Sequence, residues 1–149
     1  MVQDMTNSNS IMSGMTVSQL AKQAGVEPHV VRFYSREGLL TPQRNPGNGY
    51  MVFETGDIHR LHFIRLAKRL GYTLTEIHEI LRDAERGESP CPKVRDILSH
   101  RINQTRRKVQ ELTALQVRME NALKQWEQMP DGVPDGHTVC HLIESFSKN

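Results

Sequence analysis

Two cysteines and two histidines are the residues of this sequence whose chemistry points most directly to a bound ion. Cys91 comes just before a long stretch without Gly or Pro, and His137, Cys140 and His141 lie together near the C-terminus. Thiolate and imidazole groups are ligands of zinc and its softer relatives, and a tetrahedral site needs three or four ligands. Cys91, Cys140 and one or both histidines meet that count.

The same residues also allow roles that need no metal. Because Cys140 precedes Leu142 in a short amphipathic segment, its thiol could simply be buried in an apolar cap. Alternatively, Cys91 or Cys140 could be a thiol that oxidants or electrophiles modify, with Arg95 or His141 favouring its reactive form. Zinc titration and thiol oxidation would separate the metal hypothesis from the thiol hypothesis.

An enzymatic role would use Cys140 as a nucleophile and His141 or His137 as its base. Adjacent residues on a short terminal helix rarely point at each other, and no element that could stabilise an oxyanion is evident in the sequence. We therefore predict that the protein is not an enzyme.

The composition places limits on the class of protein. The chain has 149 residues, a net charge of +2 and only short apolar runs, so it predicts neither two full domains nor a membrane-spanning segment. The polar residues 1–14 lack the pattern of a secretory signal and are interpreted as a disordered leader or a misassigned start. We expect a cytoplasmic protein, in which two cysteines do not predict a structural disulfide.

The N-terminal part contains the signals of a helix-turn-helix unit. A helix is predicted from Thr16, a potential N-cap, to a stop at Gly25, and a second one runs from Pro28 to Glu37. Two short helices joined by a tight turn that contains glycine can place the second helix in the major groove of DNA. Residues 15–70 carry eight basic and four acidic side chains, so this is the basic part of the chain.

A hairpin and two further helices complete the predicted head, which spans residues 15–86. Turn-forming residues from Asn45 to Gly49 lie between short segments of β-type residues, as in the wing of a winged helix. Helical spacing then resumes from Thr55 or Asp57 to Leu70, and again over residues 75–84.

A long helix is predicted over residues 91–128, because residues 93–128 contain no Gly and no Pro. At 1.5 Å per residue it would extend for roughly 50 Å. Its seam alternates steps of four and three residues, which favours a coiled coil with a second copy, parallel or antiparallel, over a helix that packs on its own head. The seam consists of Leu98, Ile102, Thr105, Val109, Leu112, Gln116, Met119, Leu123 and Trp126.

In this order, the elements resemble the MerR family of transcription regulators. The motifs that carry the resemblance are VSQLAKQAGV (residues 17–26), VRFY (31–34), EGLL (37–40), Gly49-Tyr50 and LAKRLGYTLTEI (66–77). The resemblance implies a mainly α fold, with a winged helix-turn-helix head and a long dimerisation helix that forms an antiparallel coiled coil. It also implies a homodimer that binds palindromic promoter DNA and distorts the spacer for RNA polymerase. A pure coiled-coil scaffold would not need these motifs.

The resemblance assigns DNA-contact roles to particular residues. Arg32 is expected in the major groove with Tyr34 supporting it, and the remaining positions are expected to hold the DNA backbone. Met51 stands where an arginine usually follows the Gly-Tyr pair, and Phe53 stands where a tyrosine is common, so a phosphate contact of the wing is in question and Arg44 could replace it. The full predicted set is Ser18, Arg32, Tyr34, Arg44, Tyr50, Arg65 and Lys68.

The resemblance also bears on the effector. With a cysteine at the start of the long helix, this sequence resembles the divalent-ion sensors of the family, whereas its copper(I) sensors usually carry a serine at that position. Cys91 therefore favours zinc, cadmium, lead or mercury as the effector. Residues 126–134 lack the usual first loop cysteine, so His137 or His141 would replace it, which favours zinc or cobalt. Residues 129–149 are thus predicted to be an effector-binding loop with a short helix, too small for a drug pocket. Asp131 and Asp135 are predicted to shape turns of this loop.

Overall fold

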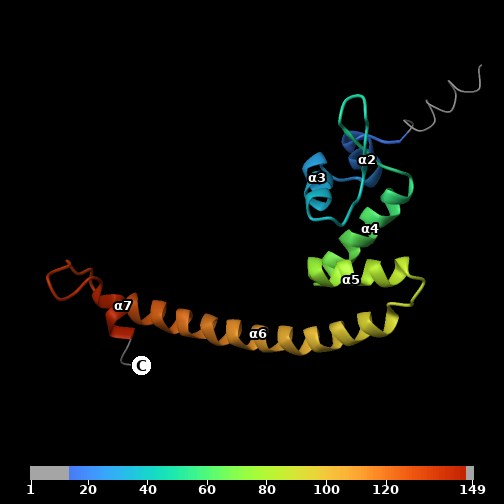
Figure 1. Cartoon of the computed structure of the whole chain (residues 1–149). Coiled ribbons are helices and arrows are strands. Elements are labelled where there is room, and N and C mark those ends of the chain that lie inside the picture. The colour runs from blue at the N-terminus through green and yellow to red at the C-terminus, as the bar shows by residue number, and fades with distance from the viewer. Residues whose placement is uncertain (1–13, 147–149) are drawn as a thin grey trace, which may run out of the picture. The chain divides into compact units, whose positions relative to one another are not determined.

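A computed structural model of the protein describes residues 14–146, and within them the fold is mainly helical (Figure 1). Residues 1–13 of the predicted leader and the last three residues of the predicted tail lie outside the described part. The chain divides into two compact units between Leu98 and Ser99. Within the described residues, no helix is both long enough and apolar enough to cross a membrane.

The first two helices form the predicted helix-turn-helix. Helix α2 (Val17–Ala24) begins at Thr16, whose hydroxyl accepts a hydrogen bond from the Gln19 amide while the Gln19 side chain accepts one from the Thr16 amide. This reciprocal pair satisfies two amides that a helix start leaves unpaired. The helix ends at Gly25 in the left-handed conformation, with φ 71°. Helix α3 (Pro28–Arg36) starts on its proline.

The wing is a short antiparallel hairpin of strands β1 (Gln43–Arg44) and β2 (Met51–Val52). Gln43 pairs with Val52 and Arg44 pairs with Met51. An isolated bridge between Met15 and Phe53 joins the start of the described chain to the end of the hairpin. The wing is therefore anchored beside the start of α2.

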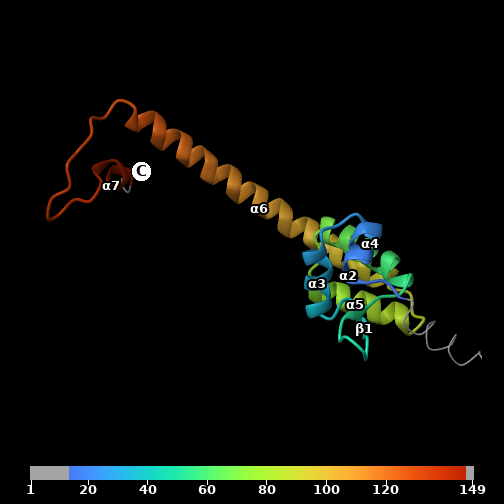
Figure 2. The same cartoon turned by 90° about the horizontal axis from the view of Figure 1, so that it is seen from above.

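Helices α4 (Gly56–Arg69) and α5 (Leu74–Glu85) follow, close to their predicted ranges. Helix α5 begins with a second reciprocal cap, in which the Thr73 hydroxyl accepts from the Glu76 amide and the Glu76 carboxylate accepts from the Thr73 amide. Figure 2 shows α2, α3, α4 and α5 gathered around one centre.

The α5 cap predicts a measurable stability difference. Thr73→Ala removes one half of the cap and should lower the free energy of unfolding by about 1 kcal/mol, which lowers Tm by several degrees for a domain of this size. Thr75→Ala changes an exposed threonine of the same helix outside the cap and is the matched control. Thermal unfolding at one protein concentration checks both variants, and equal Tm values for the two would contradict this role of the cap.

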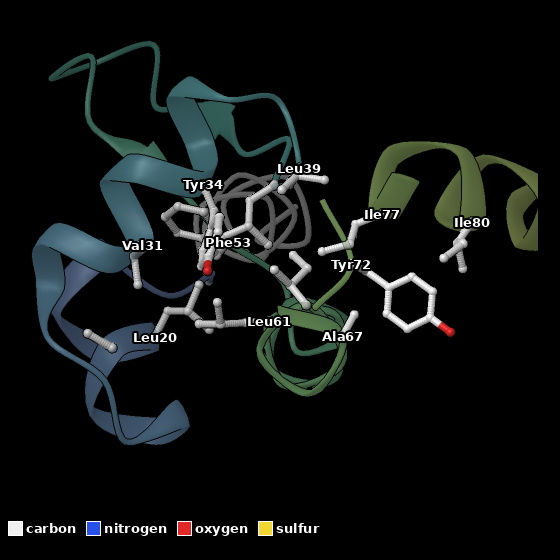
Figure 3. Close-up of a cluster of buried hydrophobic side chains, with 13 residues drawn as sticks. Leu20, Val31, Tyr34, Leu39, Phe53, Leu61, Ala67, Tyr72, Ile77 and Ile80 are labelled. Carbon is white, nitrogen blue, oxygen red and sulfur yellow. The ribbon is translucent and has the colours of Figure 1, made fainter. Parts of the chain in front are cut away.

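The core of the head collects side chains from every element of the helix-turn-helix, the hairpin and the next two helices (Figure 3). Its fully buried members include Leu20 of α2, Val31 of α3, Phe53 after the hairpin and Leu61 of α4. Burial of several large apolar side chains in one cluster is the main stabilising term for a unit of this size. This core fixes the position of α3 relative to the wing.

Helix α6 (Cys91–Trp126) is the predicted long helix and crosses from the first unit into the second. Its first turns contribute Val94, Ile97 and Leu98 to the surface of the head core. Leu98, which the sequence placed first in the dimer seam, is half-buried and packs against its own head. Beyond this point the helix is largely exposed as far as Ala122.

The second unit contains the rest of α6 and the short helix α7 (His141–Phe146). Ile143 and Phe146 of α7 line an apolar groove of about 240 Å³ together with Leu115, Met119 and Trp126 of α6. Met119 and Trp126, which the sequence placed in the seam, thus also line this groove.

Candidate DNA-binding surface and sensor loop

Helix α3 and the wing form the walls of a hollow of about 530 Å³ on the head. Ser18 contributes to it from α2, Arg32 from α3, Arg44 from β1 and Tyr50 from the end of the wing turn. Four of the seven predicted DNA contacts therefore meet at one concave surface.

A neighbouring hollow of about 420 Å³ shares Arg32 and Arg44 with the first and adds Arg36. None of the residues that line the two hollows is acidic. A guanidinium can bind a phosphate or a base edge with two hydrogen bonds, so three of them around one depression make an anionic ligand favourable there. The predicted set did not include Arg36, although it follows Arg32 by four residues and a helix places such residues on one face.

The wing is braced by its own side chains. The Arg44 guanidinium donates to the Gly49 carbonyl across the hairpin at 3.0 Å, and the Asn45 side chain accepts from the Gly47 amide at 2.7 Å. Tyr50 is 69% exposed, so its hydroxyl is accessible to a ligand at the edge of the hollow. Met51 lies between the two hollows and lines both.

Two residues that the sequence linked to the DNA-binding surface lie in the core. Tyr34 is 9% exposed and its ring packs edge-on against Phe33, with 5.3 Å between centroids. It can support α3 from below but offers little surface to DNA. Phe53 is fully buried, so the expectation that this phenylalanine costs the wing a phosphate contact is corrected: the position belongs to the core (Figure 3).

Arg65 and Lys68 lie on α4 and are both exposed. Neither lines the two hollows between α3 and the wing. They are three residues apart and therefore share a face of the helix, where they form a separate basic position on the head.

The start of α6 is held to the head by three kinds of contact. The Tyr72 hydroxyl donates to the Val94 carbonyl at 2.8 Å, and Lys93 pairs with Asp83 of α5 at 2.8 Å. The hydrogen bond and charge of Asp83 raise the pKa of Lys93 above its ordinary value. Apolar contacts of Val94 with the core complete the junction.

Cys91 is the first residue of α6, and its side chain is exposed. Its amide donates to the Ser89 hydroxyl at 3.3 Å. The thiol is therefore accessible at the surface of the head. The contacts of Lys93 and Val94 hold the backbone of the helical turn that carries it.

The tail loop places two of the predicted metal ligands at one hollow. Cys140 and His141 line a depression of about 310 Å³ together with Asp131. The His141 imidazole packs so closely against Gly132 that a β-carbon on residue 132 would overlap the ring. The Cys140 amide donates to a carboxylate oxygen of Glu144 at 3.1 Å, which ties the loop to α7.

His137 takes a different place from the other predicted ligands. Its side chain is exposed, and it is not among the residues that line the depression. The Asp135 carboxylate accepts from the amides of His137 and Thr138 at 2.6 and 2.8 Å, so the predicted turn-shaping role of Asp135 is confirmed. Asp131 lines the depression with Cys140 and His141.

Within residues 14–146, no group of three or more His, Cys, Asp or Glu side chains lies close enough to hold a metal ion. Cys91 belongs to the first compact unit, and Cys140 and His141 belong to the second. The tail-loop depression is lined by one thiol, one imidazole and the Asp131 carboxylate, but these side chains do not lie close enough together to supply the three protein ligands that zinc and related ions need.

Matches to two family models identify the protein family of this chain. Residues 15–84 match the model described as the MerR HTH family regulatory protein, and residues 58–122 match the model described as MerR, DNA binding. The chain belongs to the MerR family.

Curated relatives support this MerR-family membership over most of the chain. The mercuric resistance operon regulatory protein of Bacillus cereus is 32% identical over 134 residues, which cover 89% of this chain and 96% of the relative. The HTH-type transcriptional regulator HmrR of Rhizobium leguminosarum bv. viciae is 30% identical over 107 residues, which cover 72% of this chain and 82% of the relative.

The solved structure of another transcription regulator has a similar fold. The transcription regulator PbrR691 from Ralstonia metallidurans CH34, determined in complex with lead(II), is 27% identical with a TM-score of 0.68, and the match covers 88% of this chain and 98% of that one. As a MerR-family protein, this chain is a DNA-binding transcriptional regulator and not an enzyme. The nucleophile and base considered for Cys140 are thereby excluded.

Proposed function

We propose that this protein is a homodimeric regulator that activates a promoter in response to a divalent soft metal ion, with zinc as the first candidate. The observation that carries the proposal is the tail-loop depression, where Cys140 and His141 lie side by side in sequence and line one hollow. Together with the exposed thiol of Cys91, they offer the sulfur and nitrogen ligands that such ions prefer.

The exposed seam of α6 supports the dimer. Ile102, Val109, Leu112, Met119 and Leu123 are between 49% and 64% exposed. A contiguous apolar strip of this kind on a helix in water is typical of a surface that another protein covers. A second α6 with the same seven-residue pattern is the simplest complement.

Antiparallel pairing of the two α6 helices, as the family resemblance implies, would bring the start of one helix near the end of its partner. Cys91 of one chain would then join Cys140 and His141 of the other. This arrangement explains why a single chain lacks a group of three ligands within its described residues. When bound, the ion would link the two chains through bonds that the metal-free dimer does not have.

The ligand chemistry orders the candidate ions. Two thiolates and one imidazole suit zinc and cobalt, whereas sites made only of thiolates suit mercury. Relatives of this chain are named for mercuric resistance or were solved with lead(II), so both ions belong in any test. His137 remains a proposed additional ligand, which would need the exposed side chain to turn toward the depression.

The head would act by holding promoter DNA in a distorted form. Arg32 and Arg36 are proposed to enter the major groove, and Arg44, Tyr50, Arg65 and Lys68 to hold phosphates on either side. Bending and untwisting a promoter spacer costs on the order of 1–6 kcal/mol, which the ion-bound dimer must supply through these contacts. In the cytoplasm, RNA polymerase would then be able to contact both promoter elements at once, because the distorted spacer brings them into the correct relative position.

In vitro transcription from the cognate promoter tests the proposal, with zinc, cadmium, lead, mercury, cobalt and copper added separately to the purified protein. We expect activation by at least one divalent ion and strongest activation by zinc. Sedimentation of the same preparation checks the dimer first. A monomer, or a dimer that no ion activates, would contradict the proposal.

A redox- or electrophile-responsive regulator of the same fold is the second candidate, and the exposure of Cys91 favours it. In that case a mild oxidant or a thiol-alkylating agent would change transcription in the presence of a metal chelator. The proposed metal sensor would show no activation under those conditions.

A further inference from the structure

Tyr72 occupies the turn between α4 and α5, directly beneath the start of α6. Its side chain is only 3% exposed, and its hydroxyl donates to the Val94 carbonyl at 2.8 Å. Val94 lies in the first turn of α6, three residues after Cys91. The hydroxyl therefore bonds directly to the backbone of the turn that carries the proposed metal ligand.

The other contacts of this turn constrain its position less strictly. Val94, Ile97 and Leu98 pack on the core through apolar contacts, which have no preferred direction and allow a helix to slide or rotate slightly. Lys93 pairs with Asp83, whose side chain is 15% exposed, but this pair reaches α6 only through the flexible lysine side chain. The hydrogen bond of Tyr72 is directional and shielded from water, so it fixes the register of α6 on the head.

Tyr72 is also a member of the head core that positions α3. Its amide donates to the Ala67 carbonyl at the end of α4 at 3.1 Å, and its ring belongs to the cluster that contains Leu61 of α4, Leu20 of α2 and Val31 of α3 (Figure 3). A displacement of the first turn of α6 therefore reaches α3 through close-packed side chains.

We propose that Tyr72 is a positioning residue that couples the effector site at Cys91 to the orientation of α3. The proposal rests on the function proposed above, since it assumes that an ion binds Cys91. Tyr72 touches neither the ion nor DNA. Its role is to make the first turn of α6 and the head move as one body when the ion binds.

Tyr72→Phe tests the coupling because it removes the hydroxyl and keeps the ring in the core. Promoter affinity and metal affinity of the variant should stay within about twofold of wild type. The ratio of transcription with ion to transcription without ion should fall by about fivefold, the factor that corresponds to loss of one net hydrogen bond. In the metal-free protein, hydrogen exchange of the amides of residues 94–98 should become faster.

Thr73→Ala is the matched control, since it changes the next residue and weakens the cap of α5 without touching the bond to Val94. We expect it to keep the wild-type activation ratio, because the bond between Tyr72 and Val94 stays intact. An unchanged ratio in Tyr72→Phe, or an equal loss in both variants, would overturn the coupling role. A wild-type protein that no ion activates would instead contradict the proposed function, so the two failures are distinguishable.

Discussion

Cys91→Ser and Cys140→Ser should each abolish metal-dependent transcription while leaving promoter affinity within about twofold of wild type. Serine keeps nearly the shape of cysteine but replaces a soft sulfur ligand with a hydroxyl that binds zinc, cadmium or lead poorly. Loss of one ligand from a set of three removes the site. Neither cysteine lines the hollows between α3 and the wing, so binding to DNA should be retained.

Mixed dimers make this prediction sharper. A dimer of one Cys91→Ser chain and one Cys140→Ser chain keeps one complete site if each site combines Cys91 of one chain with Cys140 of the other. It keeps none if each chain builds its own site. We expect half of the wild-type metal stoichiometry in this mixed dimer, measured by titration of the purified species.

His59→Gln is the control for the loss of a potential ligand, because it changes an exposed histidine of the head. It should leave both the metal stoichiometry and the transcriptional response unchanged. If both cysteine variants still respond normally to every ion, then a metal site built from these residues is wrong.

Arg32→Ala should weaken promoter binding by about 1–3 kcal/mol, which corresponds to roughly fivefold to 150-fold in Kd. Arg32 lines both hollows of the head and is the only residue of α3 that does so. Removal of its guanidinium takes away a donor from the centre of the basic surface. The measurement is fluorescence anisotropy with promoter DNA over a range of salt concentrations.

Salt dependence and operator variants separate base recognition from phosphate contact. If Arg32 reads a base, the variant should lose discrimination at one base pair of each half-site. Arg86→Ala, at an exposed position after α5, serves as the control for a simple loss of charge. Equal Kd values for Arg32→Ala and Arg86→Ala would contradict a central role of Arg32.

The sequence predicted the head well because its element boundaries depend on local chemistry. Thr16, Gly25 and Pro28 act through their own backbone and nearest neighbours, so their effect is visible in a short window of residues. The length of α6 was equally predictable, because residues 93–128 contain no Gly and no Pro. What the spacing could not give was the partner of each apolar residue, and Leu98 therefore fits the seam pattern although it packs on the head.

The site was predictable only in part, for the same reason. Ser18, Arg32, Arg44 and Tyr50 were assigned as a set, and they line one hollow. The burial of Phe53 depends on its place in a core that distant parts of the head build together, and no local pattern contains that information. The bond between Tyr72 and Val94 joins residues 22 positions apart, and a one-dimensional pattern does not reveal such a pair.

Helix α6 runs for 36 residues, and its exposed apolar strip returns to the same side only every seven residues. In a paired dimer, insertion of a single residue would rotate everything beyond it by about 100° and turn the strip away from its partner. Insertion of seven residues would keep the strip aligned and lengthen the helix by about 10 Å. Of these two changes, only the seven-residue insertion would alter the separation of the two heads while the strip stays paired, and it would alter the operator length that the dimer fits.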